Sequence, residues 1–468
     1  MNDKVKNSVK PQGLLISEND TALATDLYEL TMAAAYLASG QADRIAVFEA
    51  FIRKLPHNRS YLVCAGLEQV VHFLINLKFT DAQIESLKLN EAFQNAAAKD
   101  FFRYLQDFRF TGDVWAVPEG TVLFPNEPII RIEAPIIEAQ IIETFLLSII
   151  NFEGLIASKA SRVTNAAKGK AIVEFGSRRA HGPQAALLAA RASYIGGCVG
   201  TSNILASNRL GIPAFGTMAH SFVMNFQTEL EAFKEFVKVF PEGMLLVDTY
   251  DTLAAVGSIV RSGIKVSGIR LDSGDLYDLS VKSRGILDEA GYSSTLIMAS
   301  GDLNEYIISD LVRRGAPIDV FGVGTELVTS RDDPALNGVY KLVAIRSHRV
   351  GEAGEVIYKS KTSQGKATYP GPKQVYRTVD QSSGTIKLDT VALDDEIPPE
   401  NSSPLLQRYV QRGRLCTTIP TLQDIQKQHA FQVQALPAEF RRIDMTVDKF
   451  PVQLSAKLRT LAEKLGIF

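Results

Sequence analysis

The middle of the chain alternates short apolar runs with longer stretches of helical periodicity. Seven runs end in Gly, Ser, Thr or Asp, or carry these residues near their ends: AIVEFGS, GGCVGTS, IPAFGTM, GMLLVDT, VSGIRLDSGD, TLIMASGD and IDVFGVGTEL. Between most of them lie segments such as SFVMNFQTELEAFKEFVKVF, whose apolar residues recur at helical spacing. This alternation predicts a parallel sheet, which we expect to curl into an irregular α/β barrel. An open doubly wound sheet is the alternative, because periodicity does not reveal closure.

Both ends of the chain have a different pattern. In residues 1–150, helix and strand signals are mixed, and Asp26 with Glu29 predicts an N-cap and its capping-box partner for the helix LYELTMAAAYLASG. After about residue 340, YKLVAIRSHRV and EVIYKSKTS predict a β-hairpin around GEAGE. We therefore expect a catalytic barrel over 151–340, with 1–150 and 341–468 together forming one α+β domain.

Composition excludes several classes of protein. The chain has 468 residues, 46% hydrophobic and 22% charged, which is typical of a globular protein. Its 50 Lys and Arg against 52 Asp and Glu give no basic excess for binding nucleic acid. Cys64, Cys198 and Cys416 are widely spaced and lack a C-x-x-C pair. They predict neither a disulfide framework nor a structural zinc site.

Two segments bear on the cellular location. The N-terminal MNDKVKNSVKPQG is polar and lacks the apolar run of a secretory signal. The longest apolar region, APIIEAQIIETFLLSIINFEGLIA, is interrupted by Glu138, Glu143 and Glu153, which favours a buried helix over a membrane span. We expect a cytoplasmic enzyme without a membrane partner.

Candidate chemistry falls at the predicted strand ends, where parallel α/β folds build their sites. FGSRRAHGP places Phe175, Arg178 and Arg179 together, which suits stacking on a planar ring and binding of carboxylate or phosphate. Surface arginines over a core phenylalanine are the alternative. GIRLDSGDL supplies Asp272, a carboxylate for ribose hydroxyls or Mg²⁺, whereas Asp275 fits a cap of the next helix.

Glycines mark two further strand ends. FGVGTELVT contains Gly322 and Gly324, which let backbone N–H groups approach phosphate oxygens, and Thr325 follows them. ASGDLNE, from the preceding strand, adds Gly301 and Asp302. We expect the two loops to form one anion pocket.

His220, in FGTMAHSFV, lies between a strand-like run and a helical pattern. A lone histidine is more often a packed structural residue. At this place, however, an imidazole could attack a phosphoryl group, with a helix N-terminus stabilising the phosphate.

Taken together, several motifs resemble the nicotinate phosphoribosyltransferase family: TDLYELTM, EFGSRRAHGP, GTSN, GTMAHSFV, RLDSGDL, SGDLNE, GVGTELVTSRDDPALNGVYKLV and YPGPKQVYR. They follow that family's order from about Thr25 to Arg377. The resemblance implies an irregular α/β barrel joined to an α+β domain. It also implies synthesis of nicotinate mononucleotide and diphosphate from nicotinate and phosphoribosyl diphosphate, coupled to ATP hydrolysis and dependent on Mg²⁺.

The same resemblance implies roles for single residues. His220 matches the histidine that ATP phosphorylates. Tyr28 and Phe175 match the aromatic pair around the pyridine ring, with Tyr28 supplied by the second subunit of a homodimer. Other positions match residues around nicotinate and ribose (Arg178, Thr217, Arg270 and Asp272) and phosphate loops (Gly301, Gly322, Gly324 and Thr325). We add Arg179 and Asp302 to the phosphate set; Asn304 departs from a frequent aspartate. The Mg²⁺ ligands stay unknown.

Ser202, in VGTSN, is the candidate for substrate choice. Related nicotinamide-using enzymes carry an aspartate at the matching position, which would repel the carboxylate of nicotinate. We therefore expect nicotinate as the substrate. The alternative is that Ser202 only caps the helix NILASNRL.

Two other functions remain as alternatives. A different phosphate-binding barrel enzyme, such as a phosphosugar isomerase, would need a Glu or Lys base in the site and would have no use for ATP. A binding protein that keeps the fold but has lost activity would show no turnover.

Overall fold

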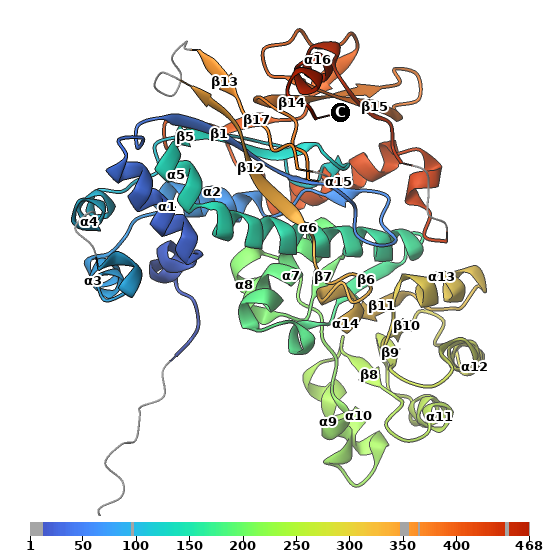
Figure 1. The fold of residues 1–468 in the computed structure, drawn as a ribbon. Helices are drawn as coiled ribbons and strands as arrows, with labels where there is room; N and C mark the ends of the chain where they lie inside the picture. The colour runs from blue at the N-terminus through green and yellow to red at the C-terminus, as the bar shows by residue number, and fades with distance from the viewer. Residues whose placement is uncertain (1–12, 95–97, 347–354, 364–365, 445–448, 468) are drawn as a thin grey trace, which may run out of the picture.

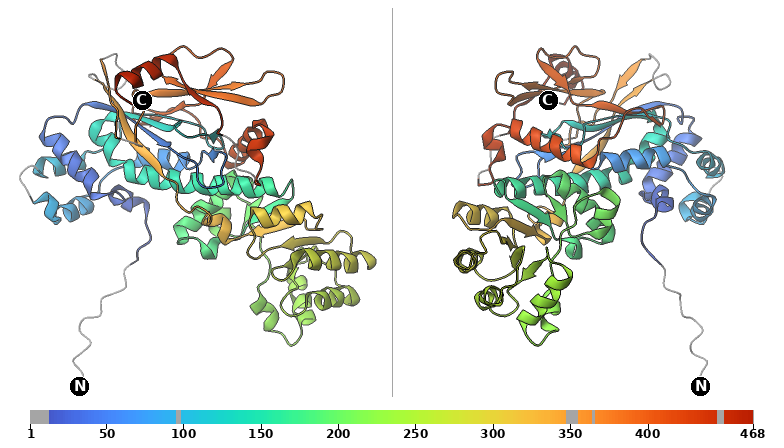
Figure 2. Two further views of the ribbon diagram at one scale, coloured as in Figure 1. Left: turned by 45° about the vertical axis from the view of Figure 1, so that its right-hand side comes forward. Right: turned by 180° about the vertical axis from the view of Figure 1, so that it is seen from behind.

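The computed structural model describes residues 13–94, 98–346, 355–363, 366–444 and 449–467. Most of the polar N-terminal stretch and the turn of the expected 340–358 hairpin therefore lie outside the described residues. Figure 1 shows two layers of sheet and helix, separated by the long helix α6 (Glu143–Ala166). Below α6 lies a half-barrel, and above it lie sheets that draw on both ends of the chain (Figure 2).

The half-barrel is a curled parallel sheet in the order β7-β6-β11-β10-β9-β8. Its strands are β6 (Ala171–Glu174), β7 (Gly200–Thr201), β8 (Met244–Leu246), β9 (Gly268–Leu271), β10 (Leu296–Ala299) and β11 (Val320–Val323). Every neighbouring pair is parallel, which confirms the predicted sheet. The expected strand IPAFGTM shrinks to one bridge, Thr201 to Ala214. Within the described residues, no backbone pairing joins this edge to β8, so the barrel stays open.

Helices follow the strands as the periodicity predicts. They are α7 (Pro183–Ile195), α8 (Ile204–Leu210), α9 (His220–Met224), α10 (Glu229–Val239), α11 (Thr252–Ser262), α12 (Leu276–Glu289), α13 (Glu305–Arg313) and α14 (Thr325–Val328). Asp275 caps α12 by accepting from the N–H groups of Tyr277 and Asp278. Asn304 caps α13 in the same way, so the departure from aspartate keeps a capping side chain there.

The larger sheet joins the two ends of the chain in the order β13-β12-β1-β5-β3-β17-β18. Its strands are β1 (Ile45–Ile52), β3 (Asp113–Ala116), β5 (Pro128–Pro135), β12 (Gly338–Arg346), β13 (Val356–Tyr358), β17 (Gln407–Gln411) and β18 (Arg414–Leu415). Antiparallel pairing of β12 with β13 confirms the strands of the predicted hairpin. Helix α6 runs continuously through the boundary expected at residue 150, and the exact domain ranges stay predictions.

Smaller elements complete this layer. A four-stranded sheet contains β14 (Lys373–Val379), β15 (Ile386–Leu393), β16 (Ser402–Pro404) and β19 (Val452–Leu454), and a two-stranded sheet contains β2 (Leu62–Val63) and β4 (Val122–Leu123). The helices are α1 (Leu27–Ala38), α2 (Leu67–Asn76), α3 (Asp81–Lys88), α4 (Ala98–Gln106), α5 (Ile136–Ile141), α15 (Leu422–Ala435) and α16 (Ala456–Lys464), with 3-10 turns η1 (Glu18–Leu23), η2 (Glu91–Phe93) and η4 (Ala438–Arg441).

Two expectations about helices have different outcomes. Helix α1 begins at Leu27, but the predicted capping box is wrong, because the Asp26 and Glu29 carboxylates instead accept from Thr144 of α6. Tertiary contact with α6 thus replaces the local cap. The apolar region 134–157 forms two helices, the buried α5 and the first part of α6, which is half-buried at its start and fully buried from Glu153 onward. In the part of the chain that the structure describes, no helix has the length and apolarity to cross a membrane.

Candidate active site

Arg270, in β9, joins side chains from several strand ends at one edge of the half-barrel. Its guanidinium donates to Thr217 Oγ1 at 2.8 Å, to Asp272 Oδ1 at 2.5 Å and to Ser300 Oγ at 2.7 Å. It also lies over the ring of Phe175, 5.6 Å from the centroid. Four of these residues were sequence candidates. Ser300 was missed, although it lies near the end of the run TLIMASGD. The rule that parallel α/β folds build their sites at strand ends, here called the strand-end rule, applies to it.

Asp272 is held as a carboxylate. Burial by itself would raise its pKa, but hydrogen bonds from Ser300 and Arg270 hold the pKa of Asp272 below its usual value. Its backbone N–H donates to Asp248 Oδ2 at 3.2 Å, and Ser273 Oγ donates to the same oxygen at 2.6 Å. Asp248 Oδ1 is buried without a hydrogen-bond partner among the described residues. The run GMLLVDT contains Asp248, so the strand-end rule points to it too, but it was not a candidate.

His220 begins α9 beside the open edge of the half-barrel. Its Nδ1 lies 3.2 Å from Thr249 Oγ1, just after β8, and its Nε2 lies 3.9 Å from Asp272 Oδ2. Its side chain is 44% exposed. His429 provides a contrast, because burial lowers its pKa to about 4 and its ring bonds Gly120 O and Ser161 Oγ. His220 therefore has the exposure of a reactive group, and His429 has the environment of a structural one.

Glycines let two strand ends approach this cluster. A Cβ at Gly322 would lie 2.6 Å from Phe175 Cδ2, so only glycine lets β11 pass so close to the ring. Gly301 has φ +107°, and a Cβ there would meet the Asp272 carbonyl oxygen at 2.6 Å. The structure thus places both glycine loops beside Asp272 and Phe175. The other loop candidates continue from these two glycines: Asp302, Gly324 and Thr325.

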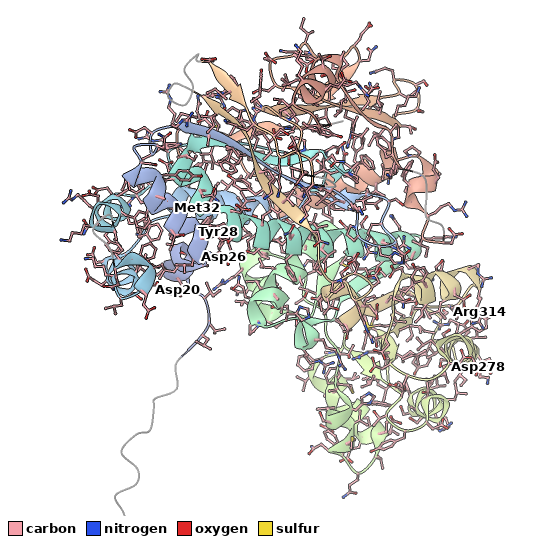
Figure 3. The ribbon with its side chains drawn as sticks, viewed as in Figure 1. Asp20, Asp26, Tyr28, Met32, Asp278 and Arg314 are labelled. Carbon is pink, nitrogen blue, oxygen red and sulfur yellow. The ribbon has the colours of Figure 1, made fainter. Side chains whose placement is uncertain are left out.

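Three predicted site residues are not drawn into the cluster within one chain. Arg178 and Arg179 lie exposed in the 3-10 turn η3 (Ser177–Arg179), without an ion pair to any described residue. Tyr28 is 47% exposed on α1. Figure 3 shows it among the N-terminal helices, apart from the half-barrel, where Asp278 lies in α12 and Arg314 directly follows α13. Burial, with Glu143 and Glu29 nearby, raises the pKa of Tyr28 to about 12, so its hydroxyl stays protonated.

Ser202 follows β7 at the same end of the sheet. The alternative, that Ser202 only caps α8, is wrong, because the cap is Asn203, whose side chain accepts from the Ala206 N–H at 3.0 Å. The backbone N–H of Ser202 donates to Glu174 O at 2.9 Å, which fixes the residue beside β6. The half-buried Ser202 side chain is thus not needed for the helix.

Family models and known relatives match most of the chain. Models of the nicotinate phosphoribosyltransferase N-terminal domain, family and C-terminal domain match residues 23–151, 170–382 and 399–462. A nicotinate phosphoribosyltransferase of Mycobacterium tuberculosis is 45% identical over 95% of this chain and 94% of its own length. The chain belongs to the nicotinate phosphoribosyltransferase family. Another relative, the Bacillus subtilis nicotinate phosphoribosyltransferase, is 40% identical over 94% of each chain.

The fold of this nicotinate phosphoribosyltransferase family member also matches a solved structure. The crystal structure of human nicotinic acid phosphoribosyltransferase has a TM-score of 0.82 and 28% identity, covering 94% of this chain and 99% of that one. The match spans both layers, so the irregular half-barrel and the domain built from both chain ends follow the family's architecture.

Proposed function

We propose that this protein transfers the phosphoribosyl group of phosphoribosyl diphosphate to nicotinate in NAD salvage, in the cytoplasm. The observation that carries the proposal is the cluster in which Arg270 binds Asp272, Ser300 and Thr217 and lies over the Phe175 ring. Relatives that align along nearly the whole chain are named for this activity. The cluster combines an aromatic face, cationic donors and a carboxylate, which suits an aromatic acid and a ribosyl group.

The chemistry needs no general base. The pyridine nitrogen uses its lone pair to bond the anomeric carbon while the bond from that carbon to the diphosphate oxygen breaks. Positive charge develops on the ribosyl ring, and we assign its stabilisation to the carboxylate of Asp272, whose pKa is held below its usual value. Phe175 stacks on the pyridine ring, and Arg178 or Arg270 supplies positive charge for the nicotinate carboxylate.

Mg²⁺ fits the acidic edge of this site. Asp248 has a buried oxygen without a hydrogen-bond partner among the described residues, and its other oxygen accepts from the backbone of Asp272. These two carboxylates would hold the ion, which neutralises the leaving diphosphate when bound. No group of three or more His, Cys, Asp or Glu suited to a metal occurs in the described ranges. Mg²⁺ commonly takes only one or two carboxylates beside substrate phosphates.

We propose further that ATP phosphorylates His220. Since Nδ1 faces Thr249, we assign the acceptor role to Nε2, which would attack the γ-phosphorus as ADP leaves. Water later removes the phosphoryl group. The closeness of Asp272 links the charge on His220 to the transfer site, so hydrolysis can bias synthesis.

The proposal includes a homodimer with shared sites. Tyr28 lies among the N-terminal helices, apart from the half-barrel to which Phe175 belongs, so the aromatic pair is complete only if a second subunit supplies Tyr28.

The test is diphosphate release from nicotinate and phosphoribosyl diphosphate, with and without ATP. We expect release that ATP stimulates. His220→Ala should keep slow, ATP-independent release and lose ATP hydrolysis and acid-labile labelling, because His220 serves phosphoryl transfer only. Undiminished labelling of this variant would refute the phosphohistidine. If the wild type releases no diphosphate, the proposed function is wrong, and a phosphosugar enzyme or an inactive binding protein becomes the better explanation.

A further inference from the structure

Lys159 of α6 is a buried charge outside the site. It is 1% exposed, and its Nζ donates to Glu305 Oε2 at 2.7 Å and pairs with Asp332 Oδ1 at 3.1 Å. Glu305 itself is fully buried. One ammonium group therefore bridges two carboxylates that lie 27 positions apart in sequence, as 332 minus 305 shows.

The two carboxylates belong to the two glycine loops. Glu305 is the first residue of α13, directly after the β10 loop that contains Gly301. Asp332 follows α14, which begins at the β11 loop that contains Gly324. Lys159 thus joins the segments in which both candidate phosphate loops end.

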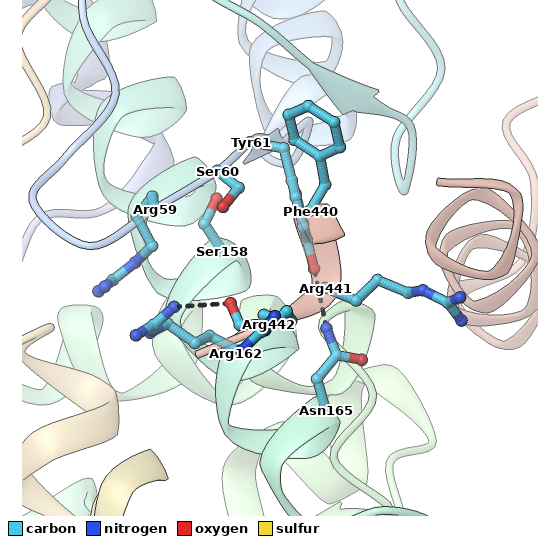
Figure 4. A pocket seen from close by; sticks show the side chains of 9 residues that line it. All are labelled: Arg59, Ser60, Tyr61, Ser158, Arg162, Asn165, Phe440, Arg441 and Arg442. Atoms are coloured by element: carbon cyan, nitrogen blue, oxygen red, sulfur yellow. Dashed lines mark hydrogen bonds between the residues drawn. The ribbon is translucent and has the colours of Figure 1, made fainter. Parts of the chain in front are cut away.

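Each carboxylate also has a second cationic partner. Arg162 Nε donates to Glu305 Oε1 at 2.9 Å, and Arg59 Nη1 donates to Asp332 Oδ2 at 2.7 Å. Both arginines line a small pocket under the C-terminal turn η4 (Figure 4). Lys159 is the member that contacts both carboxylates, so it couples what the arginines hold separately.

The loop after α14 needs such a support. Ser330 is fully buried with φ +42°, an unfavourable conformation for a residue other than glycine, and its Oγ accepts from Arg59 at 3.0 Å. Burial alone would raise the pKa of Asp332, but Arg59 and Lys159 hold it well below its usual range. Buried ion pairs are costly to desolvate and are weak evidence for stability; here their partners fix the position of a strained loop.

We propose that Lys159 is a positioning residue that sets the spacing of the two glycine loops and so the binding of phosphoribosyl diphosphate. This inference rests on the proposed function, which assigns these loops to the substrate's phosphates. Lys159 touches no substrate and acts through Glu305 and Asp332.

The experiment compares Lys159→Met with Lys373→Met. Lys373 is an equally buried lysine, paired with Glu49 at 2.8 Å in the other layer, so it controls for the loss of a buried ion pair. We expect Lys159→Met to raise the KM for phosphoribosyl diphosphate about tenfold or more, with the KM for nicotinate changed less than about twofold. Lys373→Met should lower Tm without this split.

A second variant guards against misfolding. Lys159→Arg keeps the charge but offers a planar fork in place of a compact ammonium, so it should change the loop spacing and move the same KM in the same direction. Hydrogen exchange of the wild type and the variants gives a readout without catalysis. In Lys159 variants, residues 300–304 and 322–326 should exchange faster together, while residues 244–249 stay as in the wild type.

The outcomes separate the two proposals. Equal rises in both KM values, or unchanged exchange in both loops, would overturn the role of Lys159. If the wild type makes no nicotinate mononucleotide but both loops still loosen, the proposed function fails and the coupling of the loops stands.

Discussion

Replacing Arg270 with lysine tests the centre of the candidate site. The guanidinium makes three side-chain hydrogen bonds at 2.5 to 2.8 Å, to Thr217, Asp272 and Ser300. A lysine ammonium keeps the charge but lacks the planar fork, and from this backbone position it can satisfy about one of the three partners. The substitution therefore removes geometry while it conserves charge.

The size of the effect follows from the bonds lost. Hydrogen bonds to charged groups contribute roughly 1.5–3 kcal/mol each, so two lost bonds correspond to about 3–6 kcal/mol of organisation at the site. Each 1.36 kcal/mol on a barrier is about a tenfold change in rate. Because neighbouring groups and water relax around the lysine, we expect the lower end, a fall in kcat/KM of at least about a hundredfold.

Arg284 supplies a matched control. Its guanidinium also donates three hydrogen bonds in the half-barrel, to the Asp288 carboxylate and to the carbonyl oxygens of Thr295 and Tyr292. Arg284 lies on α12, away from the cluster. Arg284→Lys should lower Tm about as much as Arg270→Lys and leave kcat/KM within about threefold of the wild type. Steady-state assays of nicotinate mononucleotide formation measure both variants. An Arg270→Lys enzyme with kcat/KM within about threefold of the wild type would refute the argument.

Three further predictions test specificity, assembly and stability. Ser202→Asp should lower kcat/KM for nicotinate about tenfold or more while nicotinamide use holds or rises, because carboxylates about 4 Å apart repel by roughly 1–4 kcal/mol; equal loss of both substrates contradicts this. Mixing inactive Tyr28→Ala and Asp272→Ala subunits should restore a fraction of the activity, and exchange without recovery counts against shared sites. Burial lowers the pKa of His429 from 6.5 to about 4, so between these pH values the unfolded chain binds a proton at this residue and the folded chain does not. Stability therefore decreases as the pH is lowered through this interval. At pH 5 this costs roughly 2 kcal/mol relative to pH 7.5, so in urea unfolding His429→Gln should lose less over that interval than the wild type; equal losses would contradict the assignment.

The strand-end rule predicted part of the cluster around Arg270: it gave Phe175 and Asp272, whereas Thr217 and Arg270 came from the family resemblance. The four residues belong to runs separated by up to 97 positions, 272 minus 175, and the structure brings them together. The rule works because parallel strands end at one edge of a sheet, whatever their separation in the chain. Applied to every run, it also points to Ser300.

Local capping was predicted less well. Asp275 caps α12 as the alternative foresaw, but the Asp26 side chain bonds Thr144, and Asn203 caps α8 instead of Ser202. Serine and asparagine are nearly equal as caps, so a one-residue shift of the helix start is invisible in the sequence. A cap also competes with tertiary partners that a local window does not contain.

The charged residues inside α6 show why the sequence did not predict the contacts between this helix and the half-barrel. Glu153, Lys159 and Arg162 interrupt an apolar pattern, and periodicity alone places such residues toward solvent. All three are buried, with partners 38 to 146 positions away: Glu153 pairs with Arg191 of α7, and the other two pair with Glu305. Desolvating these charges is compensated only when α7 and α13 of the half-barrel present these partners to α6. The interior charges of α6 therefore favour one placement of the half-barrel beneath the other layer, because a shifted placement would leave them buried and unpaired.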